Sequence, residues 1–257
     1  VIVSERNNPE MSRMGFKLRC AGRVLYYCAA AVVVQTRRMK EHFNGLGYQR
    51  VAAIPNPVFF AGVSPAYNLP QKCVVGMGKL SEQKGFDVLL RAFAEVGTEY
   101  PEWSLFIFGL GRERDRLRAL SARMGMGGKV SLPGRADPKN VFEQADIFVL
   151  SSRWEGFPNV LLEAMACGVP VVAADCDYGP REIVRDSRNG VLVRPENVRE
   201  LSSALKNLIA DKERRAFLGK NASAVRGRYT PEKIADAWER LIRGCISPAG
   251  QRRGDEE

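Results

Sequence analysis

Short apolar runs alternate with amphipathic stretches between residues 72 and 195. The apolar runs are rich in Val, Ile and Phe, as buried strands are, and lie at residues 73–78, 104–109, 129–132, 147–150, 170–174 and 190–193. Between them, apolar residues recur at helical spacing, most clearly on one face made by Phe86, Leu89, Leu90, Phe93 and Val96. This alternation predicts an α/β fold with a doubly wound parallel sheet, whose ligands bind at the carboxyl ends of its strands.

The same pattern predicts the other elements. Helices are expected at 112–124, 138–145, from Pro158 to about 166, at 180–185, and after the last strand at 198–210, 213–228 and 231–244. The start of the chain alternates in the same way, with strands at 1–4, 30–36 and 51–55 and helices at 11–28 and 37–45. A proline-rich uncharged segment, 56–71, then has the composition of a linker.

These changes in composition predict the division of the chain into domains. Residues 1–55 are expected to be the remnant of an N-terminal acceptor-side domain, 56–71 a linker, 72–228 a ligand-binding domain, 229–246 a C-terminal helix packed back on the N-terminal domain, and 247–257 a disordered tail. Because the chain starts at Val1 with a strand pattern and no initiator methionine, we expect it to be part of a longer protein.

Composition argues against several classes of protein. The six cysteines are scattered without a C-x-x-C pair, and His42 lies apart from other possible ligands, so neither a zinc site nor a disulfide framework is expected. This cysteine usage fits a reducing cytoplasm best. The longest uncharged stretch, 51–71, contains four prolines and cannot form a membrane-spanning helix.

Positive charge is concentrated at the start of the chain. The net charge is +10, and residues 1–50 contribute +6 of it through nine Lys or Arg against three Glu. A basic helix over 11–28, with Leu18, Val24 and Leu25 among its arginines, could contact an anionic membrane or substrate, although a solvated basic face explains it as well. No zinc finger, RNP-type aromatic pattern or basic repeat accompanies the charge, so nucleic acid is not an expected partner.

Two glutamates, Glu155 and Glu163, bracket the run EGFPNVLLE. Pro158 suits the first position of a helix, and a helix start with the positive end of its dipole is a ready anion site. The backbone N–H groups expected to face the anion belong to Phe157, Asn159 and Val160. A phosphate there would leave the two carboxylates free to hold hydroxyl groups, whereas one exposed loop carboxylate and one helix-face carboxylate would fit the spacing equally well.

Lysines follow the strand at 73–78. Lys79 and Lys84 would place two ammonium groups at the end of this strand, where a diphosphate is attracted, across a cleft from the helix start at Pro158. Solvated charge is the plainer interpretation of two loop lysines. Because a helix start is expected opposite the two lysines, phosphate binding becomes the better interpretation of them.

Glycines follow the next strand. Gly109 and Gly111 begin a dinucleotide-type pattern that fails at Arg114, where its third glycine would stand, so a nicotinamide enzyme is a weak candidate. The two glycines are expected to allow a tight turn and the close approach of a ligand. Arg135, in the loop after the strand at 129–132, would lie beside a base or on the surface.

Taken together, these segments carry a resemblance to a known family. In this order, GKLSEQKG, FGLGRERDRL, SLPGR, SSRWEGFPNVLLEAMACGVPVVA and GPREIV to NGVLV resemble the nucleotide-sugar half of retaining glycosyltransferases of family four, which have the GT-B fold. The resemblance covers residues 72–195, and VIVSERNNP, AVVVQT and IPNPV resemble the end of the family's N-terminal domain and its linker. It implies a complete Rossmann-like C-terminal domain and a truncated N-terminal one.

The resemblance also implies a role for each matching residue. Glu155 would contact the donor sugar, Lys79 and Lys84 the diphosphate, and these three are the expected catalytic residues. Positive groups stabilise a leaving nucleoside diphosphate, so neither a divalent metal nor another cofactor is required. Glu163 would hold the ribose hydroxyls. The other expected donor-binding residues are Gly78, Arg135, Phe157, Pro158, Asn159 and Val160.

The implied function is transfer of a hexosyl or N-acetylhexosaminyl group from a nucleotide sugar, UDP-linked, to a saccharide or lipid-linked acceptor with retention of configuration. The implied setting is bacterial cell-surface polysaccharide synthesis in the cytoplasm, with peripheral contact of residues 1–50 on the inner face of the membrane. A nucleotide-sugar epimerase of the same fold and a nucleotide-sugar-binding fragment without turnover remain alternatives. A paired-carboxylate glycosidase would explain neither the lysines nor the doubly wound pattern.

Overall fold

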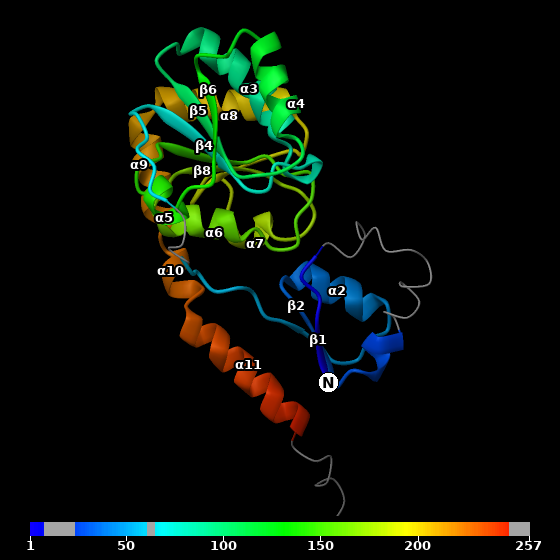
Figure 1. The fold of residues 1–257 in the computed structure, drawn as a ribbon. Helices are drawn as coiled ribbons and strands as arrows, with labels where there is room; N and C mark the ends of the chain where they lie inside the picture. The colour runs from blue at the N-terminus through cyan, green and yellow to red at the C-terminus, as the bar shows by residue number, and fades with distance from the viewer. Residues whose placement is uncertain (8–23, 61–64, 247–257) are drawn as a thin grey trace, which may run out of the picture.

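Two parallel sheets organise the computed structural model, which describes residues 1–7, 24–60 and 65–246 (Figure 1). The larger sheet contains β4 (Cys73–Met77), β5 (Ser104–Phe108), β6 (Val130–Gly134), β7 (Ile147–Leu150), β8 (Val171–Ala174) and β9 (Val191–Val193). Their order is β6-β5-β4-β7-β8-β9, and every described pairing is parallel. The strand order reverses between β4 and β7, so the predicted doubly wound α/β sheet is confirmed and its ligand crevice is expected there.

Helices cover both faces of this sheet (Figure 1). The helices of this part of the chain are η2 (Glu82–Lys84), α3 (Phe86–Glu99), α4 (Arg114–Arg123), α5 (Pro138–Phe142), α6 (Asn159–Ala166), α7 (Pro180–Ile183), α8 (Val198–Ala210), α9 (Lys212–Ala222) and α10 (Val225–Arg228), and α11 (Pro231–Ile246) runs away from the sheet toward the smaller unit. One face packs on α3, α4 and α8, and the other on α5, α6 and α10, through fully buried residues such as Phe93 and Phe148. Burial on both faces explains why the strands are almost continuously apolar.

Several of the predicted helices end at other residues in the structure or are divided. The helix expected at 138–145 stops at Phe142, and the side chain of Gln144 instead donates to the carbonyls of Asn140 and Tyr67. The helix expected at 180–185 stops at Ile183, because Val184 is extended. The helix expected at 213–228 is divided into α9 and α10.

The smaller unit is a sheet of β1 (Ile2–Ser4), β2 (Ala31–Val34) and β3 (Val51–Ala53), with α2 (Arg37–Gly45) packed against it. The predicted helix at 37–45 is confirmed, and Thr36 accepts a hydrogen bond from the Met39 N–H at its start. Most of the basic helix expected at 11–28 lies outside the described residues, and residues 24–28 are helical. The tail expected at 247–257 also lies outside them. No helix in the described ranges is long and apolar enough to cross a membrane.

The segment expected to be a linker is fastened to the larger domain on either side of residues 61–64. Before them, the Val58 N–H donates to the Tyr229 carbonyl at 2.8 Å. After them, the Tyr67 N–H donates to Asn140 Oδ1 at 2.7 Å, and the Pro65 carbonyl accepts from the Asp137 N–H at 2.8 Å. The ring of Tyr67 also packs edge-on against Phe108, with centroids 5.1 Å apart. The described residues on either side of 61–64 therefore pack along the larger domain.

The two units meet through the loop after β8. Tyr178 belongs to this loop, yet it is buried among the core residues of the smaller unit. Glu182, in α7, accepts hydrogen bonds at Oε1 from the backbone N–H groups of Arg37 and Arg38, at the start of α2. Arg38 forms an ion pair with Asp177 at 3.1 Å. At the other end of the smaller unit, α11 brings the Cys245 thiol within 3.8 Å of the Ala30 carbonyl.

Candidate functional site

A lysine and a glutamate form an ion pair at the carboxyl ends of the two central strands. Lys84 ends η2, which follows β4, and Glu155 lies in the loop after β7. The distance from Lys84 Nζ to Glu155 Oε1 is 2.5 Å, and Ser152 Oγ donates to the same oxygen at 2.6 Å. The two side chains are 16% and 6% exposed. Lys84 was expected to lie across a cleft from the helix start at Pro158, and the structure instead brings it into contact with Glu155 in the loop before that helix.

The backbone around this pair is closely packed. Gly85 has φ +61°, and a Cβ at this position would lie 2.1 Å from the Ser151 carbonyl oxygen. Ser151 Oγ donates to the Lys84 carbonyl at 2.8 Å. The loops after β4 and β7 therefore hold each other, which fixes the positions of both charged side chains.

Arg153 anchors the same loop, and the sequence analysis missed it. Its guanidinium forms a two-pronged ion pair with Asp87 on α3, at 2.9 and 2.8 Å, and bonds Glu196 at 2.7 Å. Beside this arginine the pKa of the Asp87 carboxyl is lowered, although burial of the carboxyl works in the opposite direction. The sequence carried no signal for this role, because Asp87 and Arg153 are 66 residues apart.

Glycines bring the loops after β4 and β5 together. A Cβ on Gly109 would lie 1.8 Å from the Gly78 carbonyl oxygen, and one on Gly111 would lie 2.1 Å from that of Leu80. The Gly78 N–H donates to the Phe108 carbonyl at 3.0 Å. Gly109 and Gly111 therefore make room for the neighbouring loop, and the approach of a ligand to them stays a prediction. Gly78 stands at φ +154°, beside the side chain of Lys84.

Helix α6 begins at Asn159, one residue later than expected. Pro158 has a non-helical ψ of 84° and is the N-cap, because the Leu161 N–H donates to its carbonyl at 3.0 Å. The Asn159 N–H is not free as expected, since it donates to the Phe157 carbonyl at 3.0 Å. Val160 follows in the first turn. The ring of Phe157 is buried and lies edge-on to Tyr229, with centroids 6.0 Å apart.

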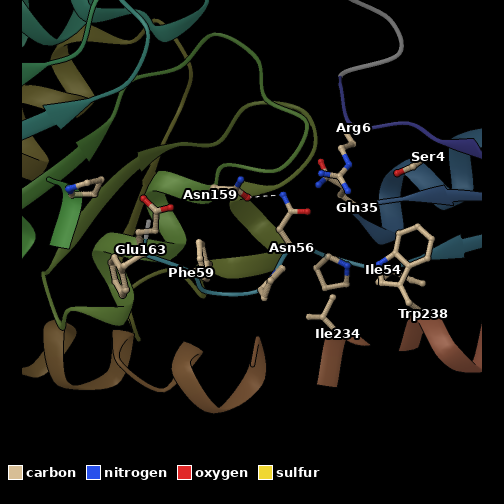
Figure 2. Close-up of a pocket in the computed structure, with 14 residues that line it drawn as sticks. Ser4, Arg6, Gln35, Ile54, Asn56, Phe59, Asn159, Glu163, Ile234 and Trp238 are labelled. Atoms are coloured by element: carbon tan, nitrogen blue, oxygen red, sulfur yellow. Dashed lines mark hydrogen bonds between the residues drawn. The ribbon is translucent and has the colours of Figure 1, made fainter. Parts of the chain in front are cut away.

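Glu163 lines a cavity of about 400 Å³ between the two units, shown in Figure 2. No described residue forms a hydrogen bond or an ion pair with its carboxyl group, and burial raises the pKa of this group to about 7. Asn159 faces the same cavity, where its Oδ1 accepts from Asn56 Nδ2 at 2.7 Å. A volume of several hundred Å³ is in the range of small-molecule sites.

The smaller unit supplies the other side of this cavity. Its lining residues there are Ser4, Arg6, Gln35 and Ile54, and Trp238 of α11 lies beside them (Figure 2). Gln35 is 5% exposed. A Cβ on Gly156 would lie 2.3 Å from the Arg6 carbonyl oxygen, so the backbone next to Glu155 also touches the smaller unit. The cavity and the Lys84–Glu155 pair are therefore joined through the loop at 155–159.

Two expected site residues stand apart from these clusters. Lys79 and Arg135 are exposed at the carboxyl ends of β4 and β6, and neither forms an ion pair with a described residue. In the described part of the chain, no group of three or more His, Cys, Asp or Glu side chains is placed to hold a metal ion. The arrangement places carboxylates, which can accept hydrogen bonds from hydroxyl groups, and ammonium groups, which can pair with phosphates, at one edge of the sheet.

Comparison of the sequence with known proteins identifies the family of this chain. Residues 64–225 match the family described as glycosyl transferases group 1. An exopolysaccharide phosphotransferase of Streptomyces coelicolor is 36% identical over 84% of this chain and 24% of its own length. The lipopolysaccharide core biosynthesis glycosyltransferase LpsE of Rhizobium meliloti is 34% identical over 80% of this chain and 57% of its own length. The chain thus spans only part of these relatives.

A solved structure shows the same fold. HepE from Anabaena, crystallised with UDP and glucose, superimposes with a TM-score of 0.80 at 24% identity. The alignment covers 96% of this chain and 71% of HepE. At this identity the likeness establishes the fold alone.

Proposed function

Since this chain belongs to the group 1 glycosyltransferase family, we propose that it is the donor-binding part of a retaining glycosyltransferase of family four. The proposed reaction moves a hexosyl or N-acetylhexosaminyl group from a UDP-linked sugar to a saccharide or lipid-linked acceptor. The observation that carries the proposal is the Lys84–Glu155 pair, 2.5 Å apart at the point where the strand order reverses. Doubly wound sheets bind nucleotides at this point.

Each residue of the pair has a task in this reaction. Lys84 would turn its remaining N–H donors to the diphosphate and offset the negative charge that grows as the glycosidic bond breaks. Exposed Lys79 would add a second positive charge on the solvent side. Glu155, held by Lys84 and Ser152, would accept hydrogen bonds from the donor sugar and stabilise positive character at the anomeric carbon.

Glu163 is proposed to hold the ribose. Its carboxyl group has no bond to a described residue and faces the cavity, so two ribose hydroxyls could donate to it. Gly78, Phe157, Pro158, Asn159 and Val160 would form the backbone wall along the diphosphate and sugar, and Arg135 would neighbour the base. The ammonium groups of Lys79 and Lys84 would supply the positive charge that a divalent metal provides in other transferases, so we propose that no metal cofactor is needed.

Two further parts of the proposal concern the setting. LpsE is named for lipopolysaccharide core synthesis, which supports a place in bacterial cell-surface polysaccharide synthesis. We place the protein in the cytoplasm, with residues 1–50 against the inner face of the membrane, because of their charge of +6. Nucleic acid is not a proposed partner.

The test is calorimetric titration of the chain with UDP, GDP and ADP. We expect UDP to bind in the micromolar range, Lys84→Met to weaken binding about a hundredfold, and the control Lys139→Met on α5 to leave it unchanged, since a charged hydrogen bond to phosphate contributes about 2–3 kcal/mol. Equal binding of all three nucleotides by the chain and by Lys84→Met would reject the proposal.

Binding without turnover is the second candidate, and the partial coverage of the relatives favours it. Incubation of the chain with a UDP-sugar labelled in the sugar distinguishes the outcomes: transfer to an added acceptor indicates a complete enzyme, and unchanged donor a binding fragment. An isomerised sugar on UDP would instead indicate an epimerase.

A further inference from the structure

A second cavity, of about 530 Å³, opens between the loop after α7 and helices α9 and α10. Three arginines line it, Arg185, Arg188 and Arg228, and none of its lining residues is acidic. Two apolar residues, Ile183 and Val225, form its floor, where they are 1% and 4% exposed. It shares no lining residue with the cavity at Glu163.

The three arginines lack a directly paired carboxylate among the described residues, although the guanidinium of Arg228 lies 4.9 Å from the ring centre of Tyr229. None of the three forms an ion pair with a described residue, whereas Arg153 and Arg243 do. The carboxylate nearest in sequence, that of Asp186, accepts from the Leu192 N–H at 2.8 Å and forms no ion pair with a described residue. Three guanidinium groups around one cavity repel one another, so an anion bound there would be stabilised.

The loop that carries two of the arginines is held in place. The Arg185 N–H donates to Asn189 Oδ1 at 2.7 Å, and Asn221 on α9 donates to the Arg188 carbonyl at 2.9 Å. Arg214 donates to the Ser187 carbonyl at 3.0 Å. With the backbone fixed at several points, only the arginine side chains need to be ordered when a ligand binds, which lowers the entropy cost of binding.

An exposed aromatic ring extends the apolar floor. Phe217 on α9 lines the cavity and is 50% exposed, and the guanidinium of Arg214 lies 5.7 Å from its ring centre. A ligand that covered this ring would gain hydrophobic free energy in addition to the ionic contacts. The lining thus pairs a cationic rim with an apolar floor.

We propose that this cavity binds an amphiphilic phosphate ester. The phosphate would lie among Arg185, Arg188 and Arg228, whose planar forks match its oxygens, and the alkyl portion would lie on Ile183, Val225 and Phe217. A phospholipid head group or a soluble alkyl phosphate offers this chemistry. The proposal is independent of the donor site, because it uses none of the residues proposed to bind the nucleotide sugar.

Calorimetry with three small probes tests the two halves of the ligand. Octyl phosphate, below its micelle concentration, is expected to bind at least tenfold more tightly than inorganic phosphate or octyl glucoside. The double variant Arg188→Ala/Arg228→Ala should lose this binding, and Phe217→Ala should weaken octyl phosphate but not inorganic phosphate. The control Arg91→Ala/Arg118→Ala removes the same charge from exposed positions on α3 and α4 and should bind as the unaltered chain does.

Vesicle flotation identifies the source of the ligand. Binding to phosphatidylglycerol vesicles, lost in Arg188→Ala/Arg228→Ala and kept in the control, indicates a lipid head group. Octyl phosphate binding without vesicle binding indicates a soluble ester. The proposal is overturned if both double variants lose binding equally, which would reflect overall charge, or if inorganic phosphate binds as tightly as octyl phosphate. Thermal unfolding of each variant verifies that it is folded.

Discussion

The ammonium group of Lys84 lies 2.5 Å from the carboxylate of Glu155, although 71 residues separate them in the chain. Both side chains are largely buried, so each charge depends on the other for its stabilisation. An ion pair at the switch point of the sheet therefore supports the fold before any ligand arrives, and a bound ligand would have to share its charges.

Replacing Lys84 by methionine should destabilise the chain by about 3 kcal/mol, because it leaves the carboxylate of Glu155 buried without its partner. The double variant Lys84→Met/Glu155→Gln should recover part of this loss. Urea unfolding of the two single variants and the double variant measures the coupling. Additive losses would contradict a direct pair.

The free energy of unfolding should depend on pH through the titration of the Glu163 carboxyl group. Its pKa is about 7 in the folded chain and near 4.5 when unfolded, so the folded state holds the proton more tightly. Stability should therefore fall as the pH rises from about 4.5 to 7, and then level off. Glu163→Gln should be more stable than the unaltered chain at pH 8 by on the order of 2 kcal/mol, and similar to it at pH 4.5. Urea unfolding at both pH values measures this difference, and an equal difference at both would refute the assignment.

The affinity for a nucleotide sugar should also depend on the protonation of Glu163, but it should rise with pH whereas stability falls. A deprotonated Glu163 accepts hydrogen bonds from hydroxyl groups better than a protonated one, so the affinity for a UDP-sugar should fall as the pH drops from 8 to 6. Glu163→Gln should bind more weakly, with a flat pH profile. UDP-glucose suits this titration, because its diphosphate does not titrate in this range. A sloped profile in the variant would assign the effect to another group.

Gly109→Ala should destabilise the chain by on the order of 3 kcal/mol, since its Cβ would lie 1.8 Å from the Gly78 carbonyl oxygen. Gly128→Ala is the matched control, because a Cβ there has no atom within 4 Å. Thermal unfolding of the two variants compares them. If Gly109→Ala were as stable as the control, the close contact between the two loops would not exist in solution.

The hydrogen bonds from Arg37 and Arg38 to Glu182 should contribute about 1 kcal/mol, since a carboxylate at a helix start stabilises the N–H groups there. Glu182→Ala should lower stability by this amount and increase hydrogen exchange at the first turn of α2. Glu95→Ala, at an exposed position on α3, serves as the control. Unchanged exchange at Arg37 and Arg38 would show that the two units do not dock through this contact.

The order of strands and helices in the larger domain could be predicted from the sequence because strand and helix periodicity is local. The EGFPNVLLE run predicted Glu155 and Glu163 as candidate site residues for the same reason, since the pattern lies within one short segment. The role of Arg153 could not be found in this way, because its partners Asp87 and Glu196 come from elements that only the tertiary fold brings near.

The glycines show a second limit of sequence reasoning. Gly109 and Gly111 were correctly expected to permit close approach, but the sequence could not tell a ligand from a neighbouring loop as the approaching group. The start of α6 was misplaced by one residue because proline is tolerated both at the N-cap and in the first turn. Contacts between the two units, such as that of Glu182 with α2, have no local signature at all.

The burial of Tyr178 within the smaller unit bears on how such proteins can be recombined. Tyr178 lies more than a hundred residues after the end of the smaller unit, although it packs in that unit's core. In a chimaera joined within residues 56–71, Tyr178 would therefore come from one parent and the core around it from the other. We expect a chimaera that exchanges the smaller unit to keep this packing only when the loop after β8 is exchanged with it. The packing boundary between the two units is thus discontinuous in sequence.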